Sequence, residues 1–144
     1  MTSLQPFLQA RDAVGTHHVV ALESKDAGRQ AAVSFYDLPV AHAQRPRLIM
    51  FASAGREVSD FNELATRLHA DGYPVTMIEA PGIGDSVASK ETPNLFDLAA
   101  DSHGIYRGDE QVVFLGHAFG NRVARASATL FEAQTAGVIL IASG

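Results

Sequence analysis

Cysteine is absent from all 144 residues of the chain. Its absence excludes disulfide bonds, thiolate metal sites and a cysteine nucleophile. It is also typical of proteins that work in a reducing compartment. A nucleophile or a metal ligand, if this chain has one, is therefore not a thiolate.

Long apolar runs and basic tracts are missing as well. No run approaches the ~20 apolar residues that span a bilayer, and the N-terminal residues lack the basic and apolar regions of a signal peptide. The formal net charge is −5 and the arginines are scattered. This balance gives no electrostatic case for binding nucleic acid or an anionic membrane. We therefore expect a cytoplasmic protein whose partner is a small-molecule ligand or substrate.

The remaining composition is that of an ordinary globular protein. Hydrophobic residues make up 47% of the chain and charged residues 19%. A chain of this length buries enough surface for one workable core. We therefore expect a single domain over residues 1–144.

Short apolar segments alternate with helical patterns along the chain. Residues 17–22 and 31–36 flank the turn-forming residues 25–28, which predicts a β-hairpin. Four further strands are predicted, each followed or preceded by residues at helical spacing; they cover residues 47–52, 75–78, 112–115 and 138–141. Ser59 or Asp60 is expected to cap the first helix. The order predicts an α/β fold: an N-terminal β-hairpin, a mostly parallel sheet, and helices on both faces.

One pentapeptide stands out, Gly116-His117-Ala118-Phe119-Gly120. It follows a predicted strand and precedes a predicted helix, which is the layout of a nucleophile elbow, G-x-S-x-G. The place of the serine is taken by Ala118, whose methyl group cannot attack a carbonyl. Two origins of this alanine are open: it is native, or it replaces a serine to trap a ligand. The intact surroundings favour the native residue.

Three segments in this order resemble the α/β-hydrolase family. "LIMFASAGREVSDF" is similar to the family's strand followed by His-Gly-x, and "VTMIEAPGIGDS" to its strand, acid and Pro-Gly-x-Gly-x-Ser. "VVFLGHAFGNRVAR" is similar to its elbow and the following helix. The resemblance covers residues 47–144. It implies a partial α/β-hydrolase fold and hydrolysis of an ester, amide or related bond, with no cofactor and no metal.

The resemblance also implies a site at the carboxyl ends of the strands. The backbone N–H groups of Ala54 and Phe119 match the oxyanion-hole donors of the family, and Ala118 matches its nucleophile position. A donor of this kind typically stabilises a transition state by ~3 kcal/mol. The expected substrate contacts are Ser53, Gly55, His117 and Arg122. The alternative that residues 53–55 form only a turn is left open.

The sequence departs from the family pattern in three places. The family's His-Gly dipeptide is Ala52-Ser53 here, and its serine is Ala118. The triad order in this fold is nucleophile, acid, histidine, yet residues 121–144 contain one acid, Glu132, and no histidine. We therefore expect this chain alone to be inactive as a serine hydrolase. The alternatives are a non-catalytic small-ligand-binding or scaffold module, or a truncated or degenerate hydrolase.

Smaller motifs predict structure rather than chemistry. Gly82 and Gly84 lack the third glycine and the immediate helix of a dinucleotide site. Glu79 is expected to anchor its loop by hydrogen bonds, with Asp85 in solvent. The adjacent histidines 17 and 18 point to opposite faces of a strand, which makes them a poor metal pair.

The predicted last strand, residues 138–141, is apolar on both faces. We expect one of its edges to lack a partner from the same chain, and an open apolar edge is a template for pairing. A homodimer through this edge is one expectation. A longer natural polypeptide, or an N-terminal segment that folds back over the edge, is the alternative.

Overall fold

The structure is a computed structural model, and it describes residues 12–106 and 108–142. In these ranges six strands form one sheet in the order β1-β2-β4-β3-β5-β6. The elements in chain order are β1 (Thr16–Leu22), β2 (Ala31–Leu38), β3 (Arg47–Phe51), the 3₁₀ helix η2 (Val58–Phe61), α2 (Asn62–Ala70), β4 (Val75–Ile78), α3 (Leu95–His103), β5 (Val112–His117), α4 (Gly120–Leu130), the 3₁₀ helix η3 (Glu132–Gln134) and β6 (Thr135–Ile141). None of the described helices is long and apolar enough to cross a membrane.

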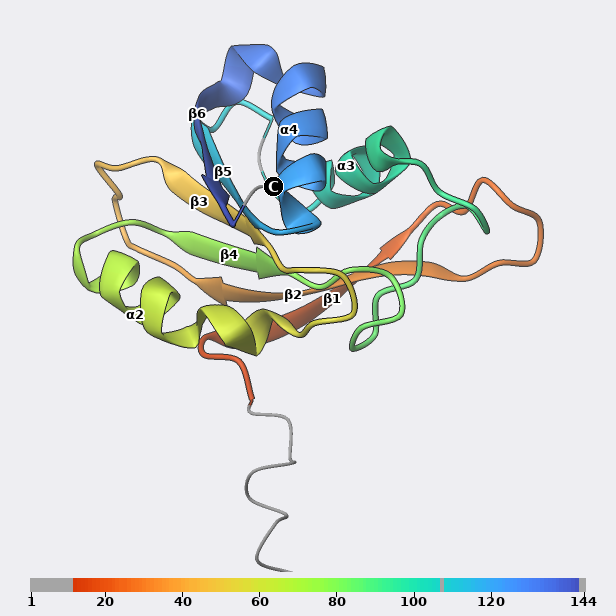
Figure 1. Ribbon diagram of the computed structural model, residues 1–144, viewed down its shortest axis with the longest axis horizontal. Coiled ribbons are helices and arrows are strands. Elements are labelled where there is room, and N and C mark those ends of the chain that lie inside the picture. The colour runs from red at the N-terminus through yellow and green to blue at the C-terminus, as the bar shows by residue number, and fades with distance from the viewer. Residues whose placement is uncertain (1–11, 107, 143–144) are drawn as a thin grey trace, which may run out of the picture.

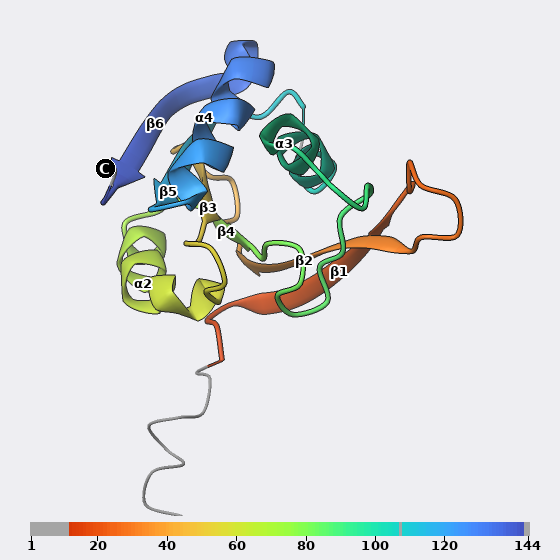
Figure 2. The same ribbon diagram turned by 45° about the vertical axis from the view of Figure 1, so that its right-hand side comes forward.

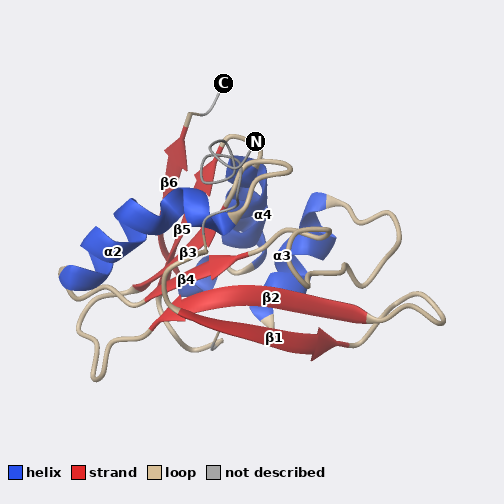
Figure 3. Cartoon of the chain, turned by 90° about the horizontal axis from the view of Figure 1, so that it is seen from below, coloured by secondary structure: helices blue, strands red, loops and turns tan. Residues whose placement is uncertain are grey.

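The sheet has an antiparallel part and a parallel part. β2 pairs antiparallel with both β1 and β4, whereas β3, β4, β5 and β6 run parallel to one another. Helix α2 covers one face, and α3 and α4 cover the other (Figure 1). Seen from below, the two edge strands β1 and β6 run in clearly different directions (Figure 3), which is the accumulated twist of the sheet. The predicted α/β class, N-terminal hairpin and two-sided helix cover are confirmed.

The core lies on both faces of β3, because alternate residues of a strand point to opposite faces. Ile49 and Phe51 belong to the cluster under α3 and α4, while Leu48 and Met50 belong to the cluster under α2. All four side chains are at most 5% exposed. A strand buried on both faces requires a continuous apolar run, which explains why the sequence shows no alternation here.

The predicted cap of the first helix is wrong. A 3₁₀ turn over Val58–Phe61 comes first, and α2 begins at Asn62 without a side-chain cap. Val58 and Phe61 are both buried. Since they lie three residues apart, a helix with three residues per turn places them on the same side. Asp60 falls inside this turn and binds the Arg56 guanidinium at 2.9 Å instead.

An ion-pair cluster closes the amino end of the parallel strands. The guanidinium of Arg47 lies 2.9 Å from an Asp37 carboxylate oxygen and 2.8 Å from one of Glu110. It also donates to Thr76 Oγ1 at 3.0 Å. The Arg47 side chain is only 19% exposed. One cation therefore ties together β2, β3, β4 and the loop before β5, at the end of the sheet opposite the elbow.

Candidate functional site

The connection between β5 and α4 consists of two residues, Ala118 and Phe119. Ala118 has a φ of 52°. A positive φ is uncommon for a residue with a side chain, because Cβ then crowds the backbone. The backbone therefore makes a sharp strand-to-helix turn at residue 118, at the carboxyl end of the parallel strands.

Two glycines allow the chain to pass through this turn. A Cβ atom at Gly120 would overlap the carbonyl oxygens of Phe51 and Ala52. A Cβ atom at Gly116 would overlap the backbone of Gly120 and Asn121. The end of β3, the end of β5 and the start of α4 thus approach one another backbone to backbone. The glycine at each end of the pentapeptide is a steric requirement.

Asn121 fixes the turn against the last strand, and sequence reasoning missed it. Its side-chain amide donates to the carbonyl of Ile141 at 2.9 Å, and its Oδ1 accepts from the Ile141 N–H at 3.2 Å. The N–H of Ala118 donates to the same carbonyl at 3.0 Å. Asn121 is 5% exposed. The sequence contains one indication of this role, because Asn121 is a polar residue three positions before Ala124 on the apolar face of the predicted helix.

The turn lies where the strand order reverses. From β3 the chain passes through α2 to β4 on one side, and then through α3 to β5 on the other side of β3. In open parallel sheets, ligands bind outside the carboxyl ends of the strands at such a point. The loop after β3, residues 53–56, and the turn at Ala118 both belong to this region.

The two predicted oxyanion donors are free in the described part of the chain. Neither the Ala54 N–H nor the Phe119 N–H donates to a described residue. Residues 53–55 do form a turn, in which the Arg56 N–H donates to the Ser53 carbonyl at 3.1 Å. Gly55 has a φ of 70° and is exposed. A turn conformation and available N–H groups are therefore compatible here.

His117 points away from the α3 and α4 face. It shares a face of β5 with Leu115, which belongs to the core cluster under α2. Its imidazole lies close enough to Asp60 to lower the pKa of that carboxyl electrostatically. The pKa of Asp60 is lowered mainly by the hydrogen bond from Arg56, with a smaller contribution from His117.

A small apolar cavity lies beside the turn on the α3 and α4 face. Its volume is about 50 Å³. Its walls come from the end of β3 and the turn, from the loop after β4, and from α3; they include Ala52, Phe119, Val123, Pro81, Ala88 and Leu98. We call it the apolar cavity. Phe119, a predicted oxyanion-hole donor, is thus one of the residues that line this cavity.

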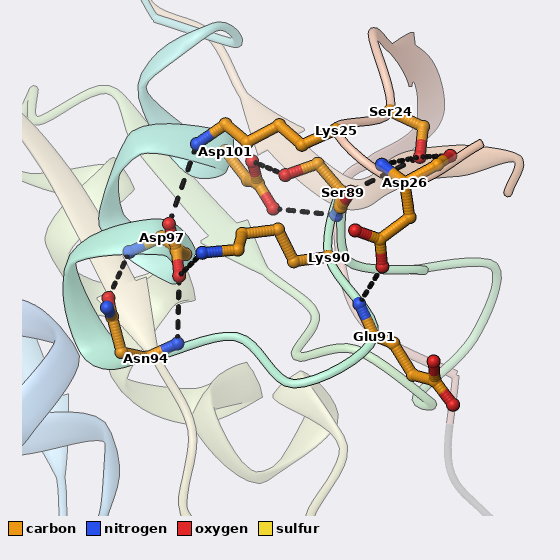
Figure 4. Close-up of polar contacts among 9 residues, drawn as sticks. All are labelled: Ser24, Lys25, Asp26, Ser89, Lys90, Glu91, Asn94, Asp97 and Asp101. Atoms are coloured by element: carbon orange, nitrogen blue, oxygen red, sulfur yellow. Dashed lines mark hydrogen bonds and ion pairs between the residues drawn. The ribbon is translucent and has the colours of Figure 1, made fainter.

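Polar contacts hold the loop that forms one wall of the apolar cavity (Figure 4). Asp101 of α3 accepts from the Ser89 N–H at 3.0 Å and from its hydroxyl at 2.7 Å. Asn94 and Asp97 form a reciprocal capping box at the start of α3. Lys90 reaches Asp97 at 3.4 Å, and the hairpin residue Lys25 reaches it at 3.5 Å. The hairpin, the loop and α3 are thereby tied into one wall.

A second, larger hollow lies on the β6 side of the turn. Its volume is about 540 Å³, and we call it the β6 hollow. It is lined by Ala118, Phe119, Asn121, Arg122, Arg125, Leu140 and Ala142. Among these described residues there is no histidine and no carboxylate. The described lining of the β6 hollow is therefore cationic.

Of the four predicted substrate contacts, Arg122 lines the β6 hollow. Phe119, a predicted oxyanion-hole donor, lines both cavities. Ser53, Gly55 and His117 are not among the described residues that line either one. Their role in binding stays a prediction.

Glu79 anchors the loop after β4, as the sequence predicts. It is 7% exposed and accepts from the Ser34 hydroxyl at 2.8 Å. His17 Nε2 lies 2.7 Å from the same hydroxyl, and the Ser34 N–H donates to Ser86 Oγ at 2.8 Å. Asp85 is exposed. Within the described ranges, no group of three or more His, Cys, Asp or Glu residues is placed to hold a metal ion.

Comparison with known proteins identifies the fold. No protein-family model matches the chain, and no curated protein matches it. A probable hydrolytic enzyme from Pseudomonas aeruginosa PAO1 is 19% identical, with a TM-score of 0.82 over 94% of this chain and 44% of its own. An alpha/beta hydrolase from Novosphingobium aromaticivorans is 23% identical, with a TM-score of 0.68 over 89% and 45%. A thermophilic esterase from Thermogutta terrifontis is 17% identical, with a TM-score of 0.69 over 88% and 46%.

The chain therefore has the α/β-hydrolase fold. It spans less than half the length of each of these three solved structures.

Proposed function

We propose that this chain is of the ester- or amide-hydrolase type and that, by itself, it is inactive as a serine hydrolase. One observation carries the proposal: the apex of the turn bears the methyl group of Ala118, at a φ of 52°. The similarity in fold to an esterase and to other hydrolytic enzymes supports the reaction type. The composition of the β6 hollow supports the inactivity, because its described lining offers two arginines and no base.

Acyl transfer through serine needs three parts. A nucleophile attacks the carbonyl, a base removes its proton, and N–H donors stabilise the oxyanion. The chain offers candidates for the third part, the N–H groups of Ala54 and Phe119. Donors without a nucleophile and a base form no acyl-enzyme intermediate. We therefore expect ester turnover close to the uncatalysed background.

The test is p-nitrophenyl acetate hydrolysis by the wild-type chain and by Ala118→Ser. We expect neither to turn over, because the introduced hydroxyl still lacks a base. Added imidazole supplies one, and we expect an acetyl group at position 118 of Ala118→Ser, located by peptide mass spectrometry and absent from the wild type treated in the same way. Ser53→Ala in the wild-type background controls for attack by the loop serine at position 53. Turnover by the wild-type chain would overturn the inactivity, and an Ala118→Ser chain that stays unacetylated at position 118 would overturn the elbow assignment.

A second function, binding of a small carbonyl compound without catalysis, is favoured by the apolar cavity. A volume of about 50 Å³ suits a short tail of about two carbon atoms, since an apolar cavity of about 150 Å³ holds a benzene molecule. A carbonyl oxygen at the Phe119 N–H would leave such a tail beside Ala88. We expect butanone to shift the amide NMR signals of these two residues. Ala88→Leu, which fills the cavity, should abolish the shifts, and equal shifts in that variant would refute the site.

A further inference from the structure

A third cavity lies on the face of the sheet that α2 covers. Its volume is about 280 Å³, and its walls come from the start of β1, from β2, from η2 and from the loop after β4. Figure 2 shows β1 and β2 on the opposite side of the sheet from β6. We call it the acidic cavity, because four carboxylates line it; they belong to Asp12, Glu57, Glu79 and Asp85.

The four carboxylates have no cationic partner among the described residues. None of them forms an ion pair with a described side chain. Arg56, which precedes Glu57, pairs with Asp60 instead. The one basic side chain among the described lining residues is the imidazole of His17. The acidic cavity therefore concentrates negative charge that the described part of the chain does not balance.

Glu79 shows that this charge extends into the protein interior. Its side chain is 7% exposed, and its Oε1 accepts from the Ser34 hydroxyl at 2.8 Å. Its Oε2 accepts no hydrogen bond from a described residue. A Cβ atom at Gly84, which also lines the acidic cavity, would overlap the Glu79 carboxylate. Because a buried carboxylate is costly without a partner, the glycine at position 84 leaves room exactly where a cation would stabilise the protein.

The charges act together at the Tyr36 hydroxyl. The pKa of Tyr36 is raised mainly by its burial and further by the charges of the same four carboxylates. Tyr36 lines the acidic cavity, and its ring stacks on His17 with the two ring centroids 4.7 Å apart. A positive charge at this place is attracted by all four carboxylates at once.

We propose that the acidic cavity binds a small organic dication of the class of short alkyl diamines. A single metal ion fits poorly, because within the described ranges no three His, Cys, Asp or Glu side chains are placed to hold one. The four carboxylates come from three separate segments, before β1, before η2 and after β4. Two ammonium groups joined by a short chain can therefore meet carboxylates of different segments.

The volume of the acidic cavity suits such a ligand. An apolar cavity of about 150 Å³ holds a benzene molecule. Putrescine has as many non-hydrogen atoms as benzene, so a cavity of about 280 Å³ accommodates it together with some water. Its two ammonium groups supply hydrogen-bond donors, and ionised carboxylates can only accept.

The experiment is isothermal titration calorimetry of the full chain with putrescine at about 50 mM ionic strength. We expect one site that binds putrescine at least tenfold more tightly than butylamine, which carries a single ammonium group on a chain of the same length. Asp85→Asn and Glu57→Gln change exposed lining residues and should each weaken putrescine binding about threefold. Glu63→Gln removes the same charge from an exposed position of α2 outside the cavity and should leave the affinity unchanged.

Glu79→Gln tests the buried carboxylate. Glutamine can still accept from the Ser34 hydroxyl but carries no charge, so we expect putrescine binding at least tenfold weaker, with circular dichroism to check folding. No binding by the wild type at about 10 mM putrescine, or equal affinity for putrescine and butylamine, would overturn the proposal. Glu63→Gln as weak as Asp85→Asn would show diffuse attraction to an acidic protein and overturn it too. This last comparison is decisive even if Glu79→Gln does not fold.

Discussion

The tight turn at Ala118 predicts that the substitution Gly120→Ala destabilises the protein, which is opposite to its usual effect in a helix. Gly120 is the first residue of α4, and its φ is not positive. Replacing a helical glycine by alanine ordinarily stabilises a protein by about 1 kcal/mol, because alanine loses less backbone entropy. Here the new Cβ would overlap the backbone carbonyls of Phe51 and Ala52. Backbone atoms of a buried strand cannot rotate aside as a flexible side chain can.

The magnitude follows from these two opposing effects. Forcing an extra carbon atom into a well-packed interior costs about 3 kcal/mol when the neighbours cannot move. The higher helix propensity of alanine offsets about 1 kcal/mol of this cost. We therefore expect Gly120→Ala to lower the free energy of unfolding by about 2 kcal/mol or more.

The matched control is Gly104→Ala at the end of α3. Gly104 has a φ of −65°, and a Cβ there would meet its nearest atoms at 3.8 and 4.0 Å, which is ordinary contact. This variant should gain about 0.4–1 kcal/mol. Urea denaturation followed by circular dichroism measures both, at one protein concentration because association shifts apparent stability. If Gly120→Ala stabilised the protein as much as Gly104→Ala does, the close approach of α4 to β3 would be wrong.

Three further predictions concern the contacts that hold the site and its surroundings. Asn121→Ala removes both hydrogen bonds to the end of β6 and should cost about 2 kcal/mol, with faster amide exchange in the last residues of that strand. Arg47→Met leaves two half-buried carboxylates without their cation and should lower the free energy of unfolding by about 2–3 kcal/mol. Arg56→Met breaks an exposed ion pair and should lower it by less than about 1 kcal/mol. Urea denaturation measures both. The pKa of Asp97 is lowered mainly by the hydrogen bond from the Asn94 N–H. The ionised Asp97 carboxylate therefore stabilises the protein fully above the ordinary aspartate pKa of about 4, and this stabilisation is lost as the pH falls through the lowered pKa. Asp97→Asn should accordingly have a lower free energy of unfolding than the wild type at pH 7 and the same free energy of unfolding in strong acid.

The order of strands and helices along the chain was predictable because buried segments need apolar residues at regular positions in the sequence. β3 is apolar at every position after Arg47, since both its faces are covered. Strand ends were less predictable. β6 begins at Thr135, before the apolar run, because Thr135 and Gly137 pair with the start of β5. Backbone pairing leaves no hydrophobic pattern in such residues.

The shape of the turn was predictable, and the contacts around it were not. Two glycines four positions apart between a strand and a helix indicate a bend whatever residue stands between them. Asn121 bonds to a residue 20 positions later, and Ser34 bonds to Glu79 across 45 positions. From residue type alone, Asn121 and Ser34 would be expected at the surface, because only the folded structure brings their partners within hydrogen-bonding distance. The apolar cavity could not be predicted from the sequence either, because its volume depends on how the surrounding side chains pack in three dimensions.

The structure separates the shape of the turn from the chemistry at its apex. A left-handed residue with a side chain costs about 1–2 kcal/mol, and Ala118 accepts this conformation without any hydroxyl group to present. The bend is fixed by the close approach at Gly116 and Gly120 and by the Asn121 bonds to β6. None of these contacts uses the side chain at position 118. A serine there can be lost without disturbing the fold, so the strained turn is evidence for the α/β-hydrolase architecture and carries no evidence for activity.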